Sequence, residues 1–194
     1  MARSAAFSSS RRYPENPRIG VSAAIISCVE GSTAPSVLLA KRGKAPSKGC
    51  WTLPGGSLEL GETVQAAVAR EIKEETTLDI SPTRPFSTTD SIHLDEDSKI
   101  EYHYVIVHMV ATVSNEPKVV AQEDVDELLW VPVDQLQEVE GLVDGTASVV
   151  HEGIEHLLMK ETLEDLNLYN VAFAWYSSVD PLASQVREAT SLSG

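Results

Sequence analysis

A glycine-rich turn followed by an acidic run is the part of the sequence best suited to chemistry. The stretch Gly55–Leu78 reads GGSLELGETVQAAVAREIKEETTL. If its second half is helical, Glu71, Glu74 and Glu75 share one face, because an α-helix turns by about 100° per residue. Three carboxylates held so close repel one another unless a cation lies between them, and carboxylate oxygens suit Mg²⁺, Mn²⁺ or Ca²⁺. The spacing therefore predicts a divalent-metal site on this helix.

This stretch resembles the Nudix box, the signature of the Nudix hydrolases. The family pattern is Gly, five residues, Glu, seven residues, Arg-Glu, an aliphatic residue, any residue, Glu-Glu, any residue, Gly and an aliphatic residue. Eight positions are in register: Gly56, Glu62, Arg70, Glu71, Ile72, Glu74, Glu75 and Leu78. A solvated acidic helix is the alternative interpretation. It would not explain why eight positions match the family pattern in register, so the metal site is favoured.

One position departs from the family pattern, since Thr77 stands where glycine is usual. Glycine there would end the helix in a left-handed conformation at little cost, whereas β-branched Thr disfavours that conformation. We therefore expect a slightly different exit from the helix. The substitution removes no catalytic group, so the site is expected to remain functional.

The resemblance implies a metal-dependent site. Its implied ligands are Glu71, Glu74 and Glu75, with Mg²⁺ as the expected cofactor and Mn²⁺ as the alternative. The carbonyl of Gly55 or Gly56 could complete the coordination, and the two glycines allow the backbone to turn tightly and approach a ligand.

Further roles follow from the same resemblance. Glu62 is expected to support the metal ligands, and Arg70 to pair with Glu62 or with a backbone carbonyl inside the loop–helix unit. The attacking water would be oriented or deprotonated by one of the box glutamates, Glu71 or Glu74, or by a glutamate outside the box. Glu123 is the first candidate outside the box and Glu127 the second.

A basic loop precedes the box. The segment 42–49, RGKAPSKG, supplies Arg42, Lys44 and Lys48 in an otherwise acidic chain. These cations either contact substrate phosphates or belong to a solvated loop, and the sequence does not separate the two interpretations.

The expected fold is α/β, an α/β/α sandwich around a mixed sheet, as the resemblance implies. A Nudix domain is expected over 18–170, after an N-terminal segment 1–17 and before a partly disordered tail 171–194. Hydrophobic periodicity and turn residues place the individual elements. Strands are predicted at 19–29, 36–41, 50–54, 86–94, 99–113 and 126–133, and helices at 63–76, 132–139 and 147–168.

The strand predicted over 99–113 is nearly continuous in its apolar character, which indicates burial on both faces. His103 and His108 lie in it, and each is interpreted as a structural hydrogen-bonding residue rather than a catalyst. Tyr102 and Tyr104 alternate with His103 and so point to the opposite face. They could stack on a base, although core packing is the default interpretation.

Composition limits the partners. The 194 residues include 15 Lys and Arg against 29 Asp and Glu, a formal net charge of −14. Such a chain is not expected to bind nucleic acid or a membrane surface by charge, although bound metal can reverse the sign locally. No apolar run approaches the ~20 residues of a membrane helix. Cys28 and Cys50 are expected to be reduced thiols.

The Arg- and Ser-rich segment 1–17 is either a flexible arm, which we favour, or a mitochondrial transit peptide. We accordingly expect a cytoplasmic protein, with mitochondria as the alternative. A homodimer is a further expectation drawn from the resemblance.

The resemblance implies hydrolysis of a diphosphate linked to another moiety. The run 38–63 resembles small ADP-ribose pyrophosphatases, and the stretches 19–28 and 101–107 resemble nucleotide triphosphate diphosphatases. ADP-ribose is the first candidate substrate, and a nucleoside triphosphate cut to monophosphate and pyrophosphate is the second. A non-catalytic Nudix-fold nucleotide-binding module is the alternative of another class, but the clustered glutamates argue against it.

Overall fold

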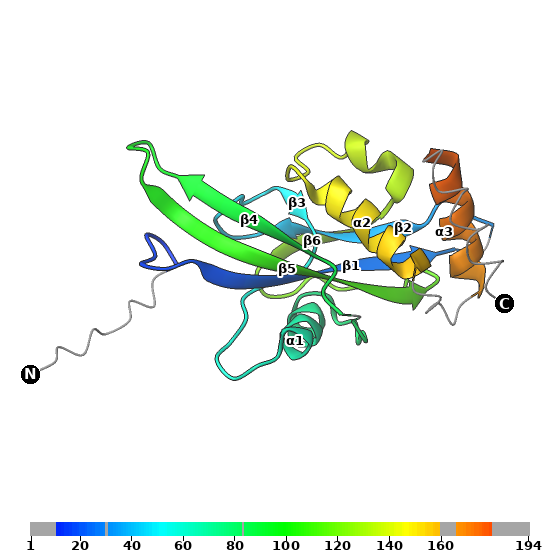
Figure 1. Cartoon of the computed structure of the whole chain (residues 1–194), viewed down its shortest axis with the longest axis horizontal. Coiled ribbons are helices and arrows are strands. Elements are labelled where there is room, and N and C mark those ends of the chain that lie inside the picture. Colours follow the sequence, from blue (N-terminus) through cyan, green and yellow to red (C-terminus); the bar gives the residue numbers. More distant parts are fainter. Residues whose placement is uncertain (1–10, 30, 83, 160–165, 180–194) are drawn as a thin grey trace, which may run out of the picture.

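The chain is described here by a computed structural model, which covers residues 11–29, 31–82, 84–159 and 166–179. Its centre is one mixed sheet (Figure 1). The sheet order is β3-β2-β1-β5-β4, with β6 paired to the other side of β2. The strands are β1 (Arg18–Cys28), β2 (Ser36–Arg42), β3 (Trp51–Thr52), β4 (Ser87–Leu94), β5 (Ile100–Ser114) and β6 (Val125–Pro132). The six strands predicted from the sequence are therefore confirmed.

The strands β1 and β5 form the parallel core of the sheet, in register from Arg18 opposite Tyr104 to Cys28 opposite Ser114. All other strand pairs are antiparallel. Between β1 and β2 only two pairs form, at the start of β2, after which the strands separate. The segment 54–58 fills the opening and binds along β1: Val21 N donates to the Gly56 carbonyl at 2.9 Å. This pairing fixes the glycine turn against the sheet.

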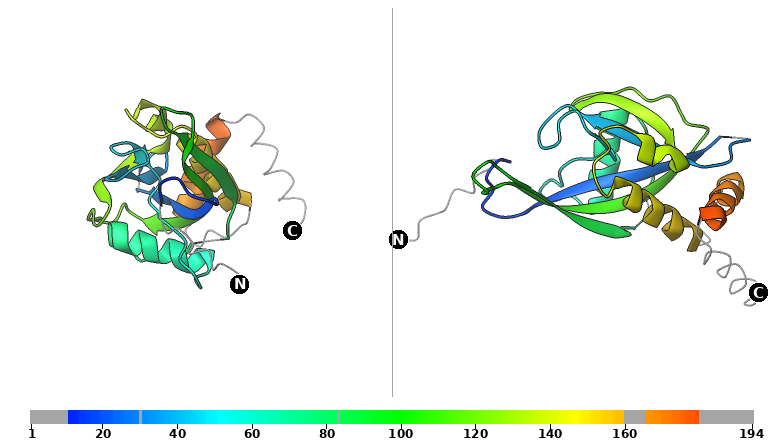
Figure 2. Two further views of the ribbon diagram at one scale, coloured as in Figure 1. Left: turned by 90° about the vertical axis from the view of Figure 1, so that its left-hand side faces the viewer. Right: turned by 90° about the horizontal axis from the view of Figure 1, so that it is seen from above.

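Helices cover both faces of the sheet, as Figures 1 and 2 show. On one face lies α1 (Val64–Thr76), whose Ala67, Val68 and Ile72 are fully buried against β1 and β5. On the other face lie α2 (Thr146–Met159), α3 (Leu166–Val179) and the short 3₁₀ helix η1 (Val133–Glu138). The predicted α/β/α sandwich is confirmed.

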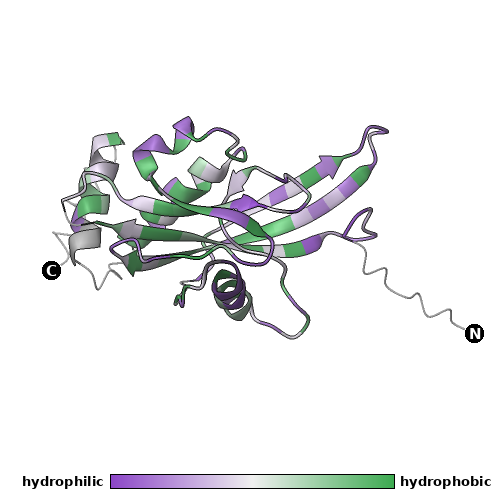
Figure 3. Cartoon of the chain, turned by 180° about the vertical axis from the view of Figure 1, so that it is seen from behind, coloured by the Kyte–Doolittle hydropathy of each residue, from purple (hydrophilic) through white to green (hydrophobic). Residues whose placement is uncertain are grey.

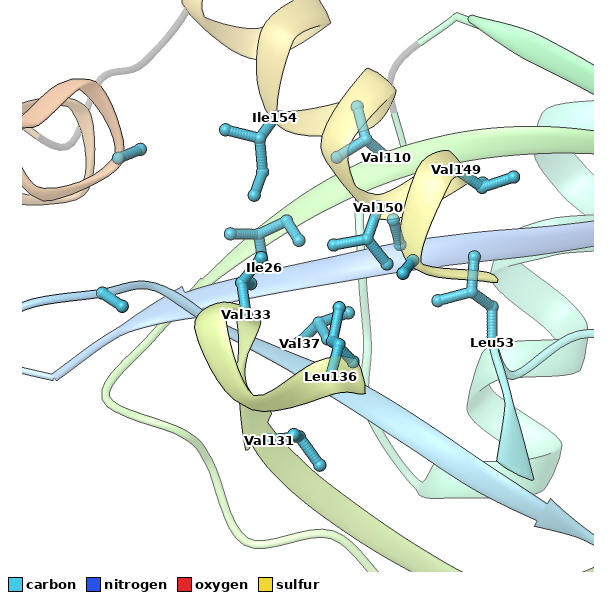
Figure 4. Packing of buried hydrophobic residues seen from close by; sticks show 14 of the residues in the cluster. Ile26, Val37, Leu53, Val110, Val131, Val133, Leu136, Val149, Val150 and Ile154 are labelled. Atoms are coloured by element: carbon cyan, nitrogen blue, oxygen red, sulfur yellow. The ribbon is translucent and has the colours of Figure 1, made fainter. Parts of the chain in front are cut away.

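The larger core lies beneath α2 and η1 (Figure 4). Branched aliphatic side chains from the sheet meet those of the helices there, and most are fully buried. Burial of each such side chain contributes about 1.5–3 kcal/mol to folding before entropy is counted. The labelled members are Ile26, Val37, Leu53, Val110, Val131, Val133, Leu136, Val149, Val150 and Ile154.

The β4–β5 hairpin extends beyond the helical layers (Figure 3). Its far part alternates between hydrophilic and hydrophobic residues, and Ile92, Leu94 and Ile100 are about half exposed, at 52%, 57% and 47%. Only the stretch 108–111 of β5 is fully buried. The expectation that this strand is buried on both faces is therefore wrong for its first half, because no helix of the described chain reaches that far.

The C-terminal part differs from its prediction. The single helix expected over 147–168 corresponds to two elements, α2 and α3, and α3 includes residues 171–179 of the expected tail. Ala172 and Trp175 of α3 are buried in the larger core. This part of the tail is folded because its apolar residues complete the cover of the sheet, while residues 180–194 lie outside the described ranges.

The exit from α1 also differs from its prediction. Thr77 adopts the left-handed conformation, with φ 69° and ψ 0°, and its N–H donates to the Lys73 carbonyl at 3.0 Å. This is the glycine-type helix end that Thr was expected to avoid. The conformation directs Leu78, which is 8% exposed, into the core beside α1. Burial of Leu78 thus outweighs the local preference of Thr.

The predicted start of α1 is confirmed. The α1 helix starts at its predicted cap, where Ala66 N donates to Thr63 Oγ1 at 3.2 Å. Cys28 and Cys50 are free thiols. None of the helices in these ranges has the length and apolar content that a membrane span requires.

Candidate active site

A pocket of about 380 Å³ opens beside the glycine turn. This volume lies in the range of small-molecule sites. Its wall combines the glycine turn with the inner side of α1, the basic loop, the β4–β5 hairpin and the loop before β6. Charged liners come from these elements other than the glycine turn, and from the segments before β1 and before α2: Arg11, Arg42, Lys44, Glu71, Glu75, Asp90, Glu123, Asp124 and Asp144.

Glu75 is the most buried carboxylate of the site, at 8% exposure. Its Oε2 accepts from Gly55 N at 2.8 Å, which ties the helix to the glycine turn. Burial, helped by the nearby Glu71 charge, raises the pKa of Glu75 to about 7, although the Gly55 hydrogen bond and the Arg42 charge act in the opposite direction. A carboxylate buried beside like charge is a site that a cation would stabilise.

Glu71 occupies a cradle that the glycine turn leaves open. Its Oε1 accepts from Ser57 N at 3.0 Å, and a methyl group on Gly56 would collide with its carboxylate. Burial also raises the pKa of Glu71. The position of Glu71 therefore explains why the box requires glycine at position 56.

Arg70 joins three parts of the box. It donates from Nε and Nη2 to both carboxylate oxygens of Glu62, at 2.7 and 3.0 Å, and from Nη2 to the Ser57 carbonyl at 3.1 Å. Both predicted partners of Arg70 are therefore present. The hydrogen bonds from Arg70 hold the pKa of Glu62 below its ordinary value. These hydrogen bonds fix the loop that carries Ser57 and Glu62 to the helix that carries Arg70.

Glu74 is bound to Arg70 and does not face the pocket. Its Oε2 lies 3.0 Å from Arg70 Nη1, and its side chain is 41% exposed and does not line the pocket. Within the described ranges, no three His, Cys, Asp or Glu side chains are grouped so as to hold a metal ion. The three predicted ligands therefore share a helix side without converging in this conformation, and Arg70 Nη1 lies 3.0 Å from an oxygen of both Glu71 and Glu74.

The donor set nonetheless fits a hard divalent cation. Two partly desolvated carboxylates, Glu71 and Glu75, face the pocket from successive turns, and carboxylate oxygens suit Mg²⁺ or Mn²⁺. The Gly56 carbonyl already accepts from Val21, so the Gly55 carbonyl is the better placed of the two candidate backbone ligands. A rotation of Glu74 away from Arg70 would bring in the third carboxylate.

The basic loop is only partly at the site. Arg42 and Lys44 line the pocket, and Lys48 does not. Arg42 Nε donates to the Pro46 carbonyl at 2.7 Å, and Lys44 Nζ pairs with the Asp124 carboxylate. The two lining cations are thus placed to meet a negatively charged substrate, whereas Lys48 is exposed on the far part of the loop.

The loop before β6 places one of the two candidate glutamates at the pocket. Glu123 lines the pocket, with a left-handed backbone at φ 52°, and so does its neighbour Asp124. The second candidate, Glu127, lies in β6 and pairs with Lys41 at 3.4 Å, outside the pocket. The position favours Glu123 over Glu127, and Asp124 is a lining carboxylate that sequence reasoning missed.

A buried histidine underlies the site. His108 Nδ1 lies 2.7 Å from Ser22 Oγ, and its Nε2 lies 2.7 Å from Thr89 Oγ1. Burial lowers the pKa of His108 to about 4, so the ring is neutral at pH 7. His108 is a structural hydrogen-bonding residue, as predicted, and all three residues line the pocket.

Comparison with known proteins settles the family. The NUDIX domain model matches residues 18–152, most of the described chain. The chain belongs to the Nudix family. Among solved structures, a MutT Nudix hydrolase from Burkholderia pseudomallei is 34% identical, with a TM-score of 0.53, over 71% of this chain and 98% of that one. The Nudix domain of Shewanella oneidensis NrtR, solved with ADP ribose, has a TM-score of 0.61 at 21% identity over 74% and 90%, and shows the shared fold.

Curated relatives have different names. An ADP-ribose pyrophosphatase of Methanocaldococcus jannaschii is 64% identical over 42 residues, or 22% of this chain and 25% of that protein. The nucleoside triphosphatase NudI of an Enterobacter species is 33% identical over 45% of this chain and 65% of its own length. A putative 8-oxo-dGTP diphosphatase 2 of Mycobacterium tuberculosis is 30% identical over 60% and 87%. The match thus spans a quarter of the first relative and less than two thirds of the second.

Proposed function

We propose that this Nudix chain is a metal-dependent hydrolase that cleaves the diphosphate of a nucleoside diphosphate linked to another moiety. ADP-ribose, cut to AMP and ribose 5-phosphate, is the first candidate. The observation that carries the proposal is the pocket itself, whose lining contains both the partly desolvated carboxylates Glu71 and Glu75 and the cations Arg42 and Lys44. Binding of a metal-bridged diphosphate requires negative carboxylates for the metal ion and positive side chains for the phosphates.

Different residues of the pocket would bind the metal ion, bind the phosphates and accept the proton. Glu71 and Glu75, joined by Glu74, would hold a divalent cation, which supplies positive charge against the diphosphate oxygens and makes water more acidic. Arg42 and Lys44 would bind the substrate phosphates. The oxygen of water attacks one phosphorus, and the bond from that phosphorus to the bridging oxygen breaks. The proton released by the water passes to a carboxylate, for which Glu123 is our candidate.

The second candidate is a nucleoside triphosphate, released as monophosphate and pyrophosphate. It is favoured by the relative named as an 8-oxo-dGTP diphosphatase, which aligns over 87% of its own length. The same charged groups would serve this substrate, because the bond broken is again a phosphoanhydride. Only the position of the nucleoside relative to the attacked phosphorus would differ.

A product assay separates these candidates. The purified chain would be incubated with ADP-ribose, NADH, dinucleoside polyphosphates and nucleoside triphosphates, with Mg²⁺, with Mn²⁺, or with a chelator. Release of AMP and ribose 5-phosphate supports the first candidate, and release of pyrophosphate supports the second. Nucleotide binding without metal-dependent turnover of any substrate would instead indicate a non-catalytic binding module.

A further inference from the structure

We propose that Arg11 binds the nucleoside part of the substrate, and that the N-terminal segment 11–17, here called the arm, holds it there. This inference rests on the proposed function, since it assigns one end of the same pocket to one part of a nucleotide. The arm precedes the region matched by the Nudix domain model, which starts at residue 18. Arg11 nevertheless lines the pocket.

The arm is tied to the β4–β5 hairpin at three points. Arg12 Nε donates to Glu101 Oε1 at 2.6 Å, Tyr13 N donates to the Glu101 carbonyl at 2.7 Å, and Tyr13 OH donates to Asp95 Oδ2 at 2.8 Å. The Arg12 guanidinium also lies 5.2 Å from the centre of the Tyr13 ring. Figures 1 and 2 show the arm beside the far part of the hairpin. These bonds hold the two residues that follow Arg11 against the hairpin.

The lining residues of the pocket fall into two groups that come from different elements. One group, here called the acidic end, contains Glu71 and Glu75 of α1 and Glu123 of the loop before β6. The other group, here called the strand end, lies on β4 and β5 and includes Asp90 and Tyr104. Between them lie the glycine turn and the start of β1. If the diphosphate binds at the acidic end, the rest of the substrate extends toward the strands.

Arg11 belongs to the strand end. Its anchor Glu101 lies on β5 three residues before Tyr104, which corresponds to about 10 Å along a strand. The register places Arg18, where the arm joins β1, directly beside Tyr104. The arm therefore joins β1 beside Tyr104 and is anchored at Glu101 on the same strand as Tyr104, and Arg11 lines this end of the pocket.

Arg11 differs from the other two pocket cations in having no hydrogen-bond or ion-pair partner within the described ranges. Arg42 is bonded to the Pro46 carbonyl and Lys44 to Asp124. Arg11 makes no hydrogen bond or ion pair with another residue of the described ranges. A guanidinium is planar and has five donors, so it can stack on a base or donate to its ring nitrogens and carbonyls. Tyr104 offers an aromatic face to the same base.

Binding of two product halves tests this assignment. AMP contains the base and ribose 5-phosphate does not, so calorimetric titration of both with wild type and Arg11→Gln isolates the base. We expect Arg11→Gln to weaken AMP binding by about 10-fold, as loss of one stacked or bonded base contact does, and to leave ribose 5-phosphate binding within about twofold. In turnover, KM should rise by the same factor and kcat should be nearly unchanged. Lys99→Gln is the matched control, because it removes an exposed charge from the same hairpin outside the pocket.

Arg12 is the positioning residue and has its own test. Arg12→Gln should weaken AMP binding like Arg11→Gln, and the double variant should be little weaker than either, because both changes remove the same contact. Three results would overturn the assignment. Arg11→Gln could weaken binding of both probes equally, it could leave AMP binding unchanged, or the wild type could fail to bind AMP. If Arg11→Gln turned over ADP-ribose with an unchanged KM, the role assigned to Arg11 would be wrong while the proposed reaction would stand. AMP binding that depends on Arg11 without any turnover would refute the proposed reaction alone.

Discussion

Arg70 and Glu74 are four residues apart on α1, and Arg70 Nη1 lies 3.0 Å from Glu74 Oε2. The same nitrogen lies 3.0 Å from Glu71 Oε1, so one guanidinium neutralises two carboxylates of the proposed metal site. Arg70 is itself fixed by Glu62 and the Ser57 carbonyl. A cation entering the site would compete with Arg70 for Glu74, which couples metal binding to the geometry of the box.

The first prediction concerns Glu74. Glu74→Gln removes one ligand charge while its side chain is 41% exposed, so we expect turnover to fall by about 100-fold or more with little change in stability. Steady-state kinetics with Mg²⁺ and a thermal unfolding curve measure the two effects. Asp79→Asn, which removes an exposed carboxylate just after the helix, is the control. Near-full activity of Glu74→Gln would show that the metal site is wrongly assigned.

The second prediction concerns the cradle at Gly56. In Gly56→Ala the new methyl group displaces the Glu71 carboxylate, so we expect kcat to fall by about 100-fold, because a ligand and its bond to Ser57 are lost together. The loss should act through Glu71. The double variant Gly56→Ala, Glu71→Gln should therefore be no slower than Glu71→Gln, as kinetics of the three variants can show. Additive losses would mean that Gly56 acts on another group.

The third prediction concerns the end of α1. Thr77→Gly should raise the free energy of unfolding by about 1 kcal/mol, because glycine adopts the left-handed conformation at φ 69° without a steric penalty. Urea unfolding measures it. Thr77→Ala keeps a Cβ and therefore its steric penalty in this conformation, so its free energy of unfolding should rise much less than that of Thr77→Gly. Equal stabilisation by Ala and Gly would point to the Thr side chain, and not to the backbone, as the source of the cost.

Local spacing was enough to predict most of the box. The shared side of Glu71 and Glu75 and the Thr63 cap join residues at most four apart, where helix geometry decides the contacts. Such predictions do not depend on the rest of the fold. The Arg70–Glu62 pair came from the family resemblance, because Glu62 precedes the helix.

The parts that sequence reasoning missed join distant residues. His108 meets Ser22 across 86 positions, and Arg12 meets Glu101 across 89, so only the sheet order brings them together. The Thr77 prediction was wrong because local preference was weighed without the burial of Leu78. The helix α3 was missed because its apolar residues show no clear helical period, and its burial comes from the sheet it covers.

The last prediction uses the buried His108. Its pKa falls from an ordinary 6.5 to about 4 on folding because burial disfavours the charged ring. Between these values the unfolded chain binds the extra proton, so the contribution of His108 to stability is complete above pH 6.5 and is lost as the pH falls toward 4. A shift of this size corresponds to about 3 kcal/mol.

Comparison with a non-titrating residue isolates this contribution. His108→Gln should be less stable than wild type at pH 7, because Gln fills the space between Ser22 and Thr89 less well. That deficit should shrink by about 3 kcal/mol at pH 4, since only the wild-type ring is protonated on unfolding. Urea unfolding of both proteins at pH 7, 5.5 and 4 measures the deficit. Because the same carboxylates titrate in both proteins, their contribution cancels in the difference between the two free energies of unfolding. A deficit that stays constant with pH would mean that His108 is solvated or charged in the folded protein.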